Sequence, residues 1–454
     1  MSAPAIHLRR RLPARRAVRL DHVIGAGALL VAAVAGALVG RSPLLGIAAG
    51  LAFVGVAGAI VAPFAVACVG VLSLSVSLEV LDAFVTQSAS LAQAEHILVV
   101  VALVPVLMRG LRDRVVPLPL LAYGVTFLVS YTLAGRLTGL NLGKSAFALV
   151  VLSIGWAAAH IRWKPSEQVP MLTCICALPL LSVVLGLVLQ LGGLHQLFGG
   201  EYTGVTRLRG ASIPSYVAFM ATVAIAAALL LHRLGYRRGI AFIIPAGLIL
   251  ALTGTRGGFI ATTVILLPWG LSVAFGGRPA GPVLVLRLLG VLVVTGAVLA
   301  IAVPPLVERT VNDPSGQTVD ASGRLEAWQY FYQKAKTSPE FGLGLGAAPL
   351  VTKDAPKLRA DFTAAHNEYL RLYVEGGVLG FVLTVGGIIV LLQQVHRRLV
   401  QPFRRDFTAL CIGFALYSIT DNTSYFAFFI PFGIIVGLYA TLGTGPREAV
   451  GATP

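Results

Sequence analysis

Residues 213–233 read IPSYVAFMATVAIAAALLLHR, an apolar stretch that ends in a histidine and an arginine. A helix needs about 20 such residues to cross the hydrocarbon core of a membrane. Strands of a membrane barrel instead alternate apolar and polar residues over about ten positions, so a helix is the expected element. Arg233 marks the expected cytoplasmic end, because Lys and Arg collect on the inner side of membrane proteins.

The same pattern extends over most of the chain. Of its 454 residues, 57% are hydrophobic and only 12% are charged, unlike an average soluble domain. The apolar runs predict fourteen spans, at residues 22–40, 44–61, 63–81, 95–109, 115–134, 144–161, 170–191, 213–233, 238–253, 257–275, 284–304, 370–395, 406–421 and 424–443. Two pairs are separated by weak breaks, at Pro63 and at residues 421–423, so we expect twelve to fourteen. The expected fold is an all-α, polytopic membrane helical bundle.

The placement of basic residues predicts the orientation of these spans. With the N-terminus inside, the inner segments hold more than half of the 35 Lys and Arg residues, whereas the short outer segments hold few. This topology gives a basic cytoplasmic N-terminus (1–21), eleven helices (22–304), a long extracytoplasmic loop with amphipathic helices (305–369), further helices (370–443) and a cytoplasmic tail (444–454).

The net charge of +16 does not indicate nucleic-acid binding. The basic residues are dispersed at loop ends, without an aromatic platform between them. The basic tract at residues 9–16 fits contact with anionic membrane lipid better. The four cysteines lie in predicted spans, where they fill apolar space. Since no His pair at helical spacing and no Asp-x-Asp clamp occurs, we expect chemistry without a metal or another cofactor.

The predicted outer loop contains an amphipathic stretch and a glycine run. Helical spacing relates Leu325, Trp328, Tyr332 and Ala335, and this helix should end before Pro339. Residues 342–346, Gly-Leu-Gly-Leu-Gly, allow close backbone approach but are weak evidence for a phosphate cradle.

His366 closes the loop and is a candidate catalytic base. A second helix is expected to begin near Ala364 and to enter the membrane through Leu370, with His366, Leu370 and Tyr373 on one face. His366 would then sit about one turn above the bilayer, within reach of a lipid headgroup. The alternative is an interfacial histidine that is hydrogen-bonded to a carbonyl.

Three arginines near the predicted outer boundary are candidate phosphate ligands. Arg256 lies in a tight turn between two spans, and Arg207 and Arg209 precede the span at residues 213–233. A guanidinium near the hydrocarbon is costly and persists where it has an anionic partner. Converging arginines would form a pyrophosphate clamp, because their forks match phosphate oxygens bidentately. Snorkelling or pairing with Glu201, Asp320 or Glu326 is the alternative.

Several of these residues follow the pattern of a known family. His366-Asn367, followed after residues 368–376 by Gly377-Val378-Leu379-Gly380, resembles the His-Asn-x9-Gly-x-x-Gly pattern of the O-antigen ligase family, which includes O-antigen polymerases. Further similarity lies in Gly323-Arg324 with Trp328, in Pro339 with Gly342-Leu343-Gly344, and in Thr255-Arg256-Gly257. The resemblance covers roughly residues 200 to 440.

The resemblance implies a metal-independent, inverting glycosyltransferase of the GT-C type in the bacterial cytoplasmic (inner) membrane, with its active site facing the periplasm or exterior. Such an enzyme passes a glycan from an undecaprenyl-diphosphate carrier to the hydroxyl of a lipid-linked or glycan acceptor, as in lipopolysaccharide assembly. By position, His366 would be the general base or would orient that hydroxyl. Arg256 would bind the donor diphosphate.

Other site residues are carried over less directly. Both Arg207 and Arg209 fit the second diphosphate-binding arginine, and we favour Arg207, three residues before Gly210. Further candidates for substrate contact are Arg324, Asn367 and Asp421.

The sequence leaves other functions open. Ligase and polymerase differ only in the acceptor, which the sequence does not define. A lipid-linked glycan transporter or flippase would show related halves and charge at mid-membrane, whereas charge here collects at the outer face. A non-catalytic scaffold would need no interfacial histidine with arginines beside it.

Overall fold

The computed structural model describes residues 62–77, 99, 101–107, 118–133, 140, 145, 149, 153, 155–200, 206–275, 324–352, 364–423 and 426–442. The predicted spans 22–40, 44–61 and 284–304 lie outside these residues, as do both predicted cytoplasmic ends and residues 305–323 of the predicted loop. The chain divides into two compact units, Met1–Ala67 and Cys68–Pro454. All elements that bear on the candidate site belong to the second unit.

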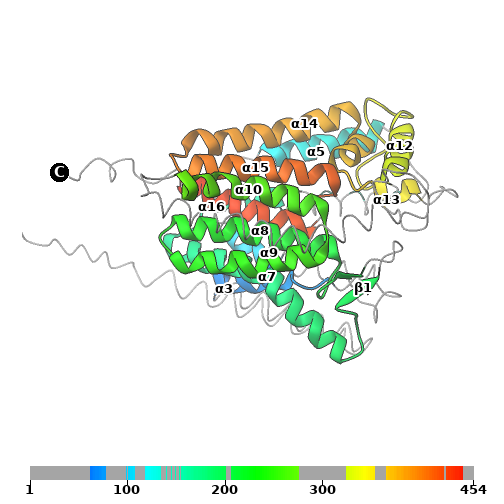
Figure 1. Cartoon of the computed structure of the whole chain (residues 1–454). Coiled ribbons are helices and arrows are strands. Elements are labelled where there is room, and N and C mark those ends of the chain that lie inside the picture. The colour runs from blue at the N-terminus through cyan, green and yellow to red at the C-terminus, as the bar shows by residue number, and fades with distance from the viewer. Residues whose placement is uncertain are drawn as a thin grey trace, which may run out of the picture. The chain divides into compact units, whose positions relative to one another are not determined.

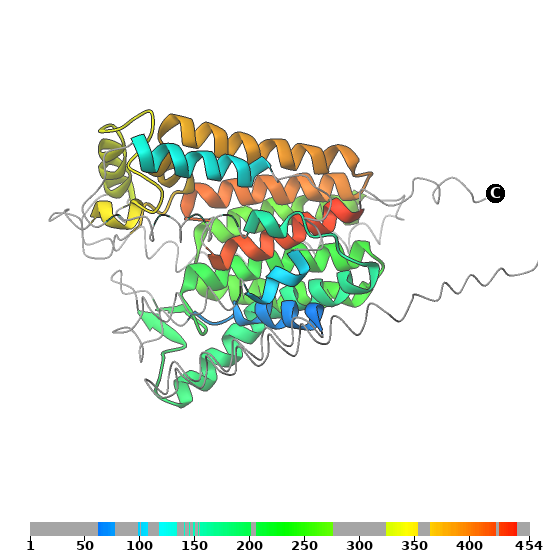
Figure 2. The ribbon, with the colours of Figure 1, turned by 180° about the vertical axis from the view of Figure 1, so that it is seen from behind.

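The described part of the second unit is mostly helical. Apart from α3 (Pro63–Ser73), which begins in the first unit, its helices are α5 (Leu118–Leu133), α7 (Pro165–Leu191), α8 (Pro214–Arg233), η4 (Arg237–Phe242, a 3-10 helix), α9 (Ile243–Thr253), α10 (Arg256–Phe275), α12 (Arg324–Ala335), α13 (Ala348–Val351), α14 (Glu368–Arg398), α15 (Phe403–Thr420) and α16 (Phe426–Leu442). Strands β1 (Phe198–Gly200) and β2 (Thr206–Leu208) form an antiparallel pair that the sequence did not predict. The long helices lie side by side, and α12, α13 and the strand pair gather at one end of them (Figures 1 and 2).

The helices confirm the prediction of an all-α membrane protein. Among the described residues, α7, α8 and α14 are long and apolar enough to cross a membrane. Most boundaries lie within a few residues of those predicted, and α8 begins with Pro214 at its first helical position. Proline suits this position because its backbone angle is already helical and no N–H is needed there. Asp421 separates α15 from α16, as its place in the sequence suggested.

Two predicted spans differ from the structure. The span at 63–81 ends early, because α3 stops at Ser73 and residues 74–77 are not helical. Residues 238–253 are not one continuous α-helix, because the 3-10 helix η4 precedes α9, which has only 11 residues. At a rise of about 1.5 Å per residue, α9 alone is roughly 16 Å long. It ends at Gly254, whose left-handed backbone (φ 58°) is the usual glycine conformation after a helix.

Helix α8 forms the centre of the second unit. All residues from 217 to 231 are buried, and α7, α9, α10 and α16 contact it. A helix that is apolar on every side is stable only where other helices or lipid surround it. Its many alanines allow neighbouring helices to approach closely, as in membrane bundles generally.

Helix α14 is interrupted at Gly377 (φ 61°, ψ −164°), and a segment of the loop completes its hydrogen bonds. In a continuous helix, the amides of residues 378 and 379 would bond to the carbonyls of residues 374 and 375. Instead, residues 339–344 supply both kinds of partner, with N···O distances of 2.8–3.1 Å: Val378 donates to Pro339, Leu379 to Glu340, Leu343 to Val374 and Gly344 to Glu375.

This contact explains why glycine occupies positions 342 and 377, which both belong to the motifs that resemble the family pattern. A Cβ atom at Gly377 would lie 2.4 Å from the backbone of Glu340, and one at Gly342 would lie 2.5 Å from the backbone of Glu375. Both glycines also have positive φ, which other residues rarely adopt. The glycine run at residues 342–346 therefore serves packing against α14, with two amides already bonded to that helix.

Candidate functional site

Several helix ends meet at the end of the bundle where α12 and β1–β2 lie, named here the His366 end. It comprises the starts of α8, α10 and α14 and the ends of α9 and α15. The Tyr417 hydroxyl of α15 donates to the Ser215 carbonyl of α8 at 3.1 Å, and a Cβ at Gly257 of α10 would lie 2.0 Å from Thr420 Oγ1. The starts of α8, α10 and α14 contribute partial positive charge here, and the ends of α9 and α15 contribute partial negative charge.

Arg207 lies across the turn that leads into Arg256. Strand β2 holds Arg207 opposite Gly199 of β1. Its Nε donates to the Thr253 carbonyl and its Nη2 donates to Thr255 Oγ1 at 2.7 Å, with only 9% of the residue exposed. Arg256 is the first residue of α10 and is partly buried. The fold thus brings these two arginines, distant in sequence, to one turn.

Arg209 occupies a different place from Arg207. Its side chain lies over β1, because a Cβ at Gly199 would be 2.4 Å from Arg209 Cδ. Its backbone amide donates to the Leu197 carbonyl at 2.8 Å. The strand pair is fixed to α7 just beyond it, where the Ala211 amide donates to Ser182 Oγ at 3.3 Å. Of the two candidates, Arg207 is therefore the one that contacts the turn before Arg256.

His366 lies outside α14, so the predicted helix start near Ala364 is wrong. The helix begins at Glu368, and Asn367 is its N-cap, with Asn367 Oδ1 accepting a hydrogen bond from the Leu370 amide at 3.0 Å. Asparagine is a favoured cap because its side chain satisfies an amide that lacks a helical partner. His366 therefore does not share a helix face with Leu370.

His366 has φ 45°, and among the described residues it is the only non-glycine with positive φ. Such a conformation costs about 1–3 kcal/mol and persists only where surrounding contacts enforce it. Its imidazole Nδ1 lies 3.4 Å from Asp421 Oδ1, with 32% of the histidine side chain and 7% of the aspartate side chain exposed. A buried carboxylate beside Nδ1 orients the imidazole ring.

Contacts to the backbone on either side of His366 also hold it. The Trp328 indole Nε1 of α12 donates to the Ala365 carbonyl at 2.8 Å. The Asn367 amide donates to Asn422 Oδ1 at 3.2 Å. Asn367 thus has structural roles in the helix cap and in this contact. Asn422 was not among the predicted site residues, because it was read only as part of the break between two spans.

A buried charge cluster in the first turns of α14 was also not predicted. Arg371 Nη1 donates to Glu375 Oε2 at 2.8 Å and its Nε donates to Glu368 Oε2 at 3.1 Å. Glu375 Oε1 in turn accepts from the Ala348 amide at 3.3 Å. This cluster ties the start of α14 to α13. The spacing of three and four residues between these charges was the signal that could have revealed it.

Helix α12 ends at Ala335, before Pro339 as predicted, but its buried face differs from the predicted one. Ala327, Phe331 and Ala335 are buried, whereas Tyr332 is 46% exposed. Phe331 and Ala335 pack in one cluster with Leu343, Ala347, Ala348, Val351, Ala365 and Val374. Arg324 is the first residue of α12.

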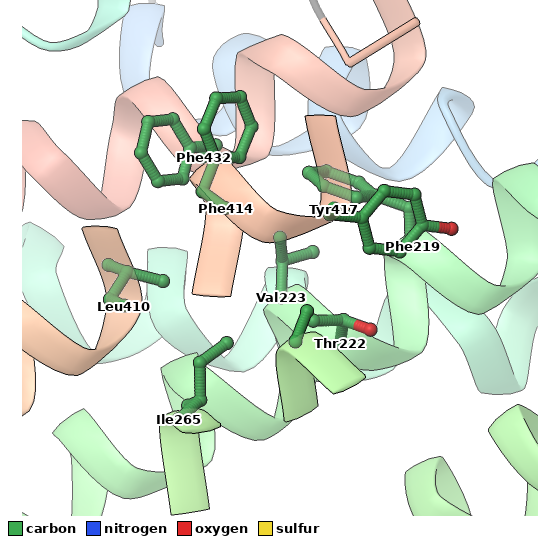
Figure 3. A pocket seen from close by; sticks show the side chains of 9 residues that line it. Phe219, Thr222, Val223, Ile265, Leu410, Phe414, Tyr417 and Phe432 are labelled. Carbon is green, nitrogen blue, oxygen red and sulfur yellow. The ribbon is translucent and has the colours of Figure 1, made fainter. Parts of the chain in front are cut away.

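A small pocket between α8, α10, α15 and α16 does not offer a site for this chemistry. Figure 3 shows its lining, which includes Phe219, Val223, Ile265, Phe414, Tyr417 and Phe432. Thr222 also faces it, but its hydroxyl donates to the Ala218 carbonyl of its own helix at 2.9 Å. An apolar lining favours neither a diphosphate nor a sugar.

Comparisons with known proteins agree with the resemblance seen in the sequence. Residues 240–385 match the family model described as O-antigen ligase. This region includes Arg256, the glycine run at residues 342–346, His366 and the break at Gly377, but neither Arg207 nor Asp421. A search of curated proteins gave no match. Residues 240–385, about a third of the chain, are therefore similar to the O-antigen ligase family.

Proposed function

We propose that this membrane protein transfers a glycan from an undecaprenyl-diphosphate carrier to an acceptor hydroxyl at the outer face of the bacterial cytoplasmic membrane. The observation that carries the proposal is the geometry of the His366 end. There, His366 faces the buried Asp421, and Arg207 lies across the turn before Arg256. The family match supports a glycosyl-transfer role.

Arg207 and Arg256 would bind the donor diphosphate. A guanidinium fork matches the oxygens of a phosphate, and the N-terminus of α10 adds partial positive charge beside Arg256. The bonds from Arg207 to the Thr253 carbonyl and the Thr255 hydroxyl orient its guanidinium. Charge that develops on the leaving diphosphate would therefore be stabilised by groups that are already in place.

His366 would activate the acceptor. As the acceptor oxygen attacks the anomeric carbon, its proton would pass to His366 Nε2, while the bond from that carbon to the diphosphate oxygen breaks. Attack opposite the leaving group inverts the anomeric centre. Asp421 would stabilise the imidazolium through Nδ1, and no metal is required because the arginines supply positive charge. Arg324 at the start of α12 remains a candidate contact for the substrate.

Reconstitution of the reaction tests this proposal. The purified protein would be supplied with a polyprenyl-diphosphate glycan and acceptor, and products would be separated by mass. Transfer that survives EDTA supports the proposal. Movement of the donor across proteoliposomes without any transfer would instead show a transporter and overturn it.

The acceptor class needs a second measurement, the analysis of surface glycans in a deletion strain. Loss of attachment with intact polymer would identify a ligase. Accumulation of single lipid-linked units would identify a polymerase that uses the same site with a growing chain as acceptor.

Single cysteines at opposite ends of the bundle test the proposed orientation. Lys336 follows α12 and Tyr236 follows α8, and both are exposed. An impermeant thiol reagent should label Lys336→Cys in intact cells and Tyr236→Cys only after lysis, with the unmodified chain as background. The reverse pattern would place the His366 end inside.

A further inference from the structure

We infer that Trp328, together with Asn422, is a positioning residue that holds the backbone of the His366 base in its strained conformation. The inference rests on the proposed function of His366 and assigns a role to α12, which does not itself supply the base. The two side chains come from different parts of the fold, Trp328 from α12 and Asn422 from the turn after α15.

The two contacts fix the two backbone angles of His366. The angle φ turns the peptide plane that contains the Ala365 carbonyl, and Trp328 Nε1 donates to that carbonyl at 2.8 Å. The angle ψ turns the next peptide plane, which contains the Asn367 amide, and this amide donates to Asn422 Oδ1 at 3.2 Å. Because only these two angles are soft in a residue's backbone, one side chain holds each of them.

The indole is itself held rigidly. Phe331 and Ala335 of α12 are fully buried against residues of α13 and α14, and Ala365 belongs to the same cluster. The position of the Trp328 N–H is therefore set by the packing of α12, and the position of His366 follows from it.

Loss of either contact would let His366 relax to negative φ, the conformation that non-glycine residues prefer. The imidazole would then move away from Asp421 Oδ1, its partner at 3.4 Å. The helix start would stay in place, because Asn367 caps it and residues 339–344 bond to its break. Arg207 would also stay, since its partners Thr253 and Thr255 are on other elements.

Steady-state kinetics of Trp328→Phe test this inference, because phenylalanine keeps an aromatic ring and removes the donor. We expect kcat for glycan transfer to fall by about 10- to 100-fold, the scale of a misplaced catalytic group. KM for the lipid-diphosphate donor should change less than about twofold, because the donor-binding arginines are undisturbed. Replacement of Trp328 by benzothienylalanine, which keeps the shape of the indole but lacks the N–H, should give the same result and exclude a packing effect.

Tyr330→Phe is the matched control, since it removes another α12 donor to a backbone carbonyl. Its kcat should stay within about twofold of the unmodified enzyme. Asn422→Ala should resemble Trp328→Phe, and the double variant should lose less than the product of the two single effects, because both act on one residue.

The outcomes separate this inference from the proposed function. If His366→Ala is inactive but Trp328→Phe and the benzothienylalanine variant transfer glycan at the normal rate, the positioning role of Trp328 is wrong. The proposed role of His366 as the base would still stand. Equal losses in Tyr330→Phe and Trp328→Phe would also contradict it, because they would show a general need for α12. Full activity of His366→Ala would instead refute the proposed function.

Discussion

Arginine makes different hydrogen bonds at the two ends of the helix bundle. At the Arg233 end, where α8 stops and α15 starts, Arg233 Nε donates to Asp406 Oδ2 at 2.6 Å and Nη2 donates to Oδ1 at 3.4 Å. Asp406 is buried, so this pair neutralises its charge inside the protein. At the His366 end, Arg207 bonds to the Thr253 carbonyl and the Thr255 hydroxyl, which orient its guanidinium. The first arrangement stabilises the fold, and the second fits the proposed role of Arg207 in binding the donor diphosphate.

A similar contrast exists between the two histidines near the ends of α14. His396 lies in the last turn with Arg397 and Arg398, where positive charge complements the helix dipole. His366 precedes the first turn in a left-handed conformation and faces a buried carboxylate. The position of His396 is explained by the helix dipole. His366 instead has a backbone conformation that non-glycine residues disfavour, which is typical of functional residues.

The largest expected difference is between the glycan transfer rates of His366→Ala and His396→Ala. Removal of a general base costs about 10²- to 10⁴-fold in rate, so glycan transfer by His366→Ala should fall by roughly 10³-fold. His396→Ala should transfer within about twofold of the unmodified protein. Transfer rates are measured at saturating donor and acceptor. Similar rates in the two variants would remove the distinction between the ends.

The next effect concerns the arginine forks. Arg256→Lys and Arg207→Lys keep a positive charge but lose bidentate geometry, so kcat/KM for the donor should fall by about 10²-fold. Arg398→Lys at the other end of α14 serves as the matched control and should show no loss. Unchanged donor kinetics in both test variants would show that the diphosphate binds elsewhere.

A smaller effect, on stability rather than catalysis, is expected at the Arg233 end. Asp406→Ala removes the partner of Arg233 and should lower the free energy of unfolding by about 2 kcal/mol, the usual value for a hydrogen bond to a charged group. The transition temperature in detergent reports this loss. Transfer per folded molecule should stay unchanged, and a catalytic defect without a stability loss would contradict the structural role.

The sequence predicted the long elements well because hydropathy and charge are local signals. The break at residues 421–423 marked a helix boundary that the structure confirms, since α15 ends at Thr420. Local signals also misled where two principles competed. The helical spacing of His366 and Leu370 favoured one continuous helix, but the preference of Asn367 for the cap position starts it two residues later.

The contacts that build the candidate site could not be predicted from one sequence. The Trp328 bond to Ala365 and the Arg207 bonds to residues 253 and 255 join segments that are far apart along the chain. The buried face of α12 was misjudged for a related reason, because Phe331 and Tyr332 are adjacent and only the packing partners decide which is buried. Residue types thus indicated the chemistry, and tertiary packing decided the geometry.

Photo-crosslinking of a donor analogue tests the central claim most directly, which is that the diphosphate binds at the His366 end. The probe is a polyprenyl diphosphate with a diazirine beside the phosphates, and labelled peptides are identified by mass spectrometry. We expect adducts in the peptides that contain residues 206–210 and 253–258, and their loss in Arg256→Ala. Adducts concentrated in residues 233–238 or 397–406, or undiminished labelling in that variant, would contradict the account.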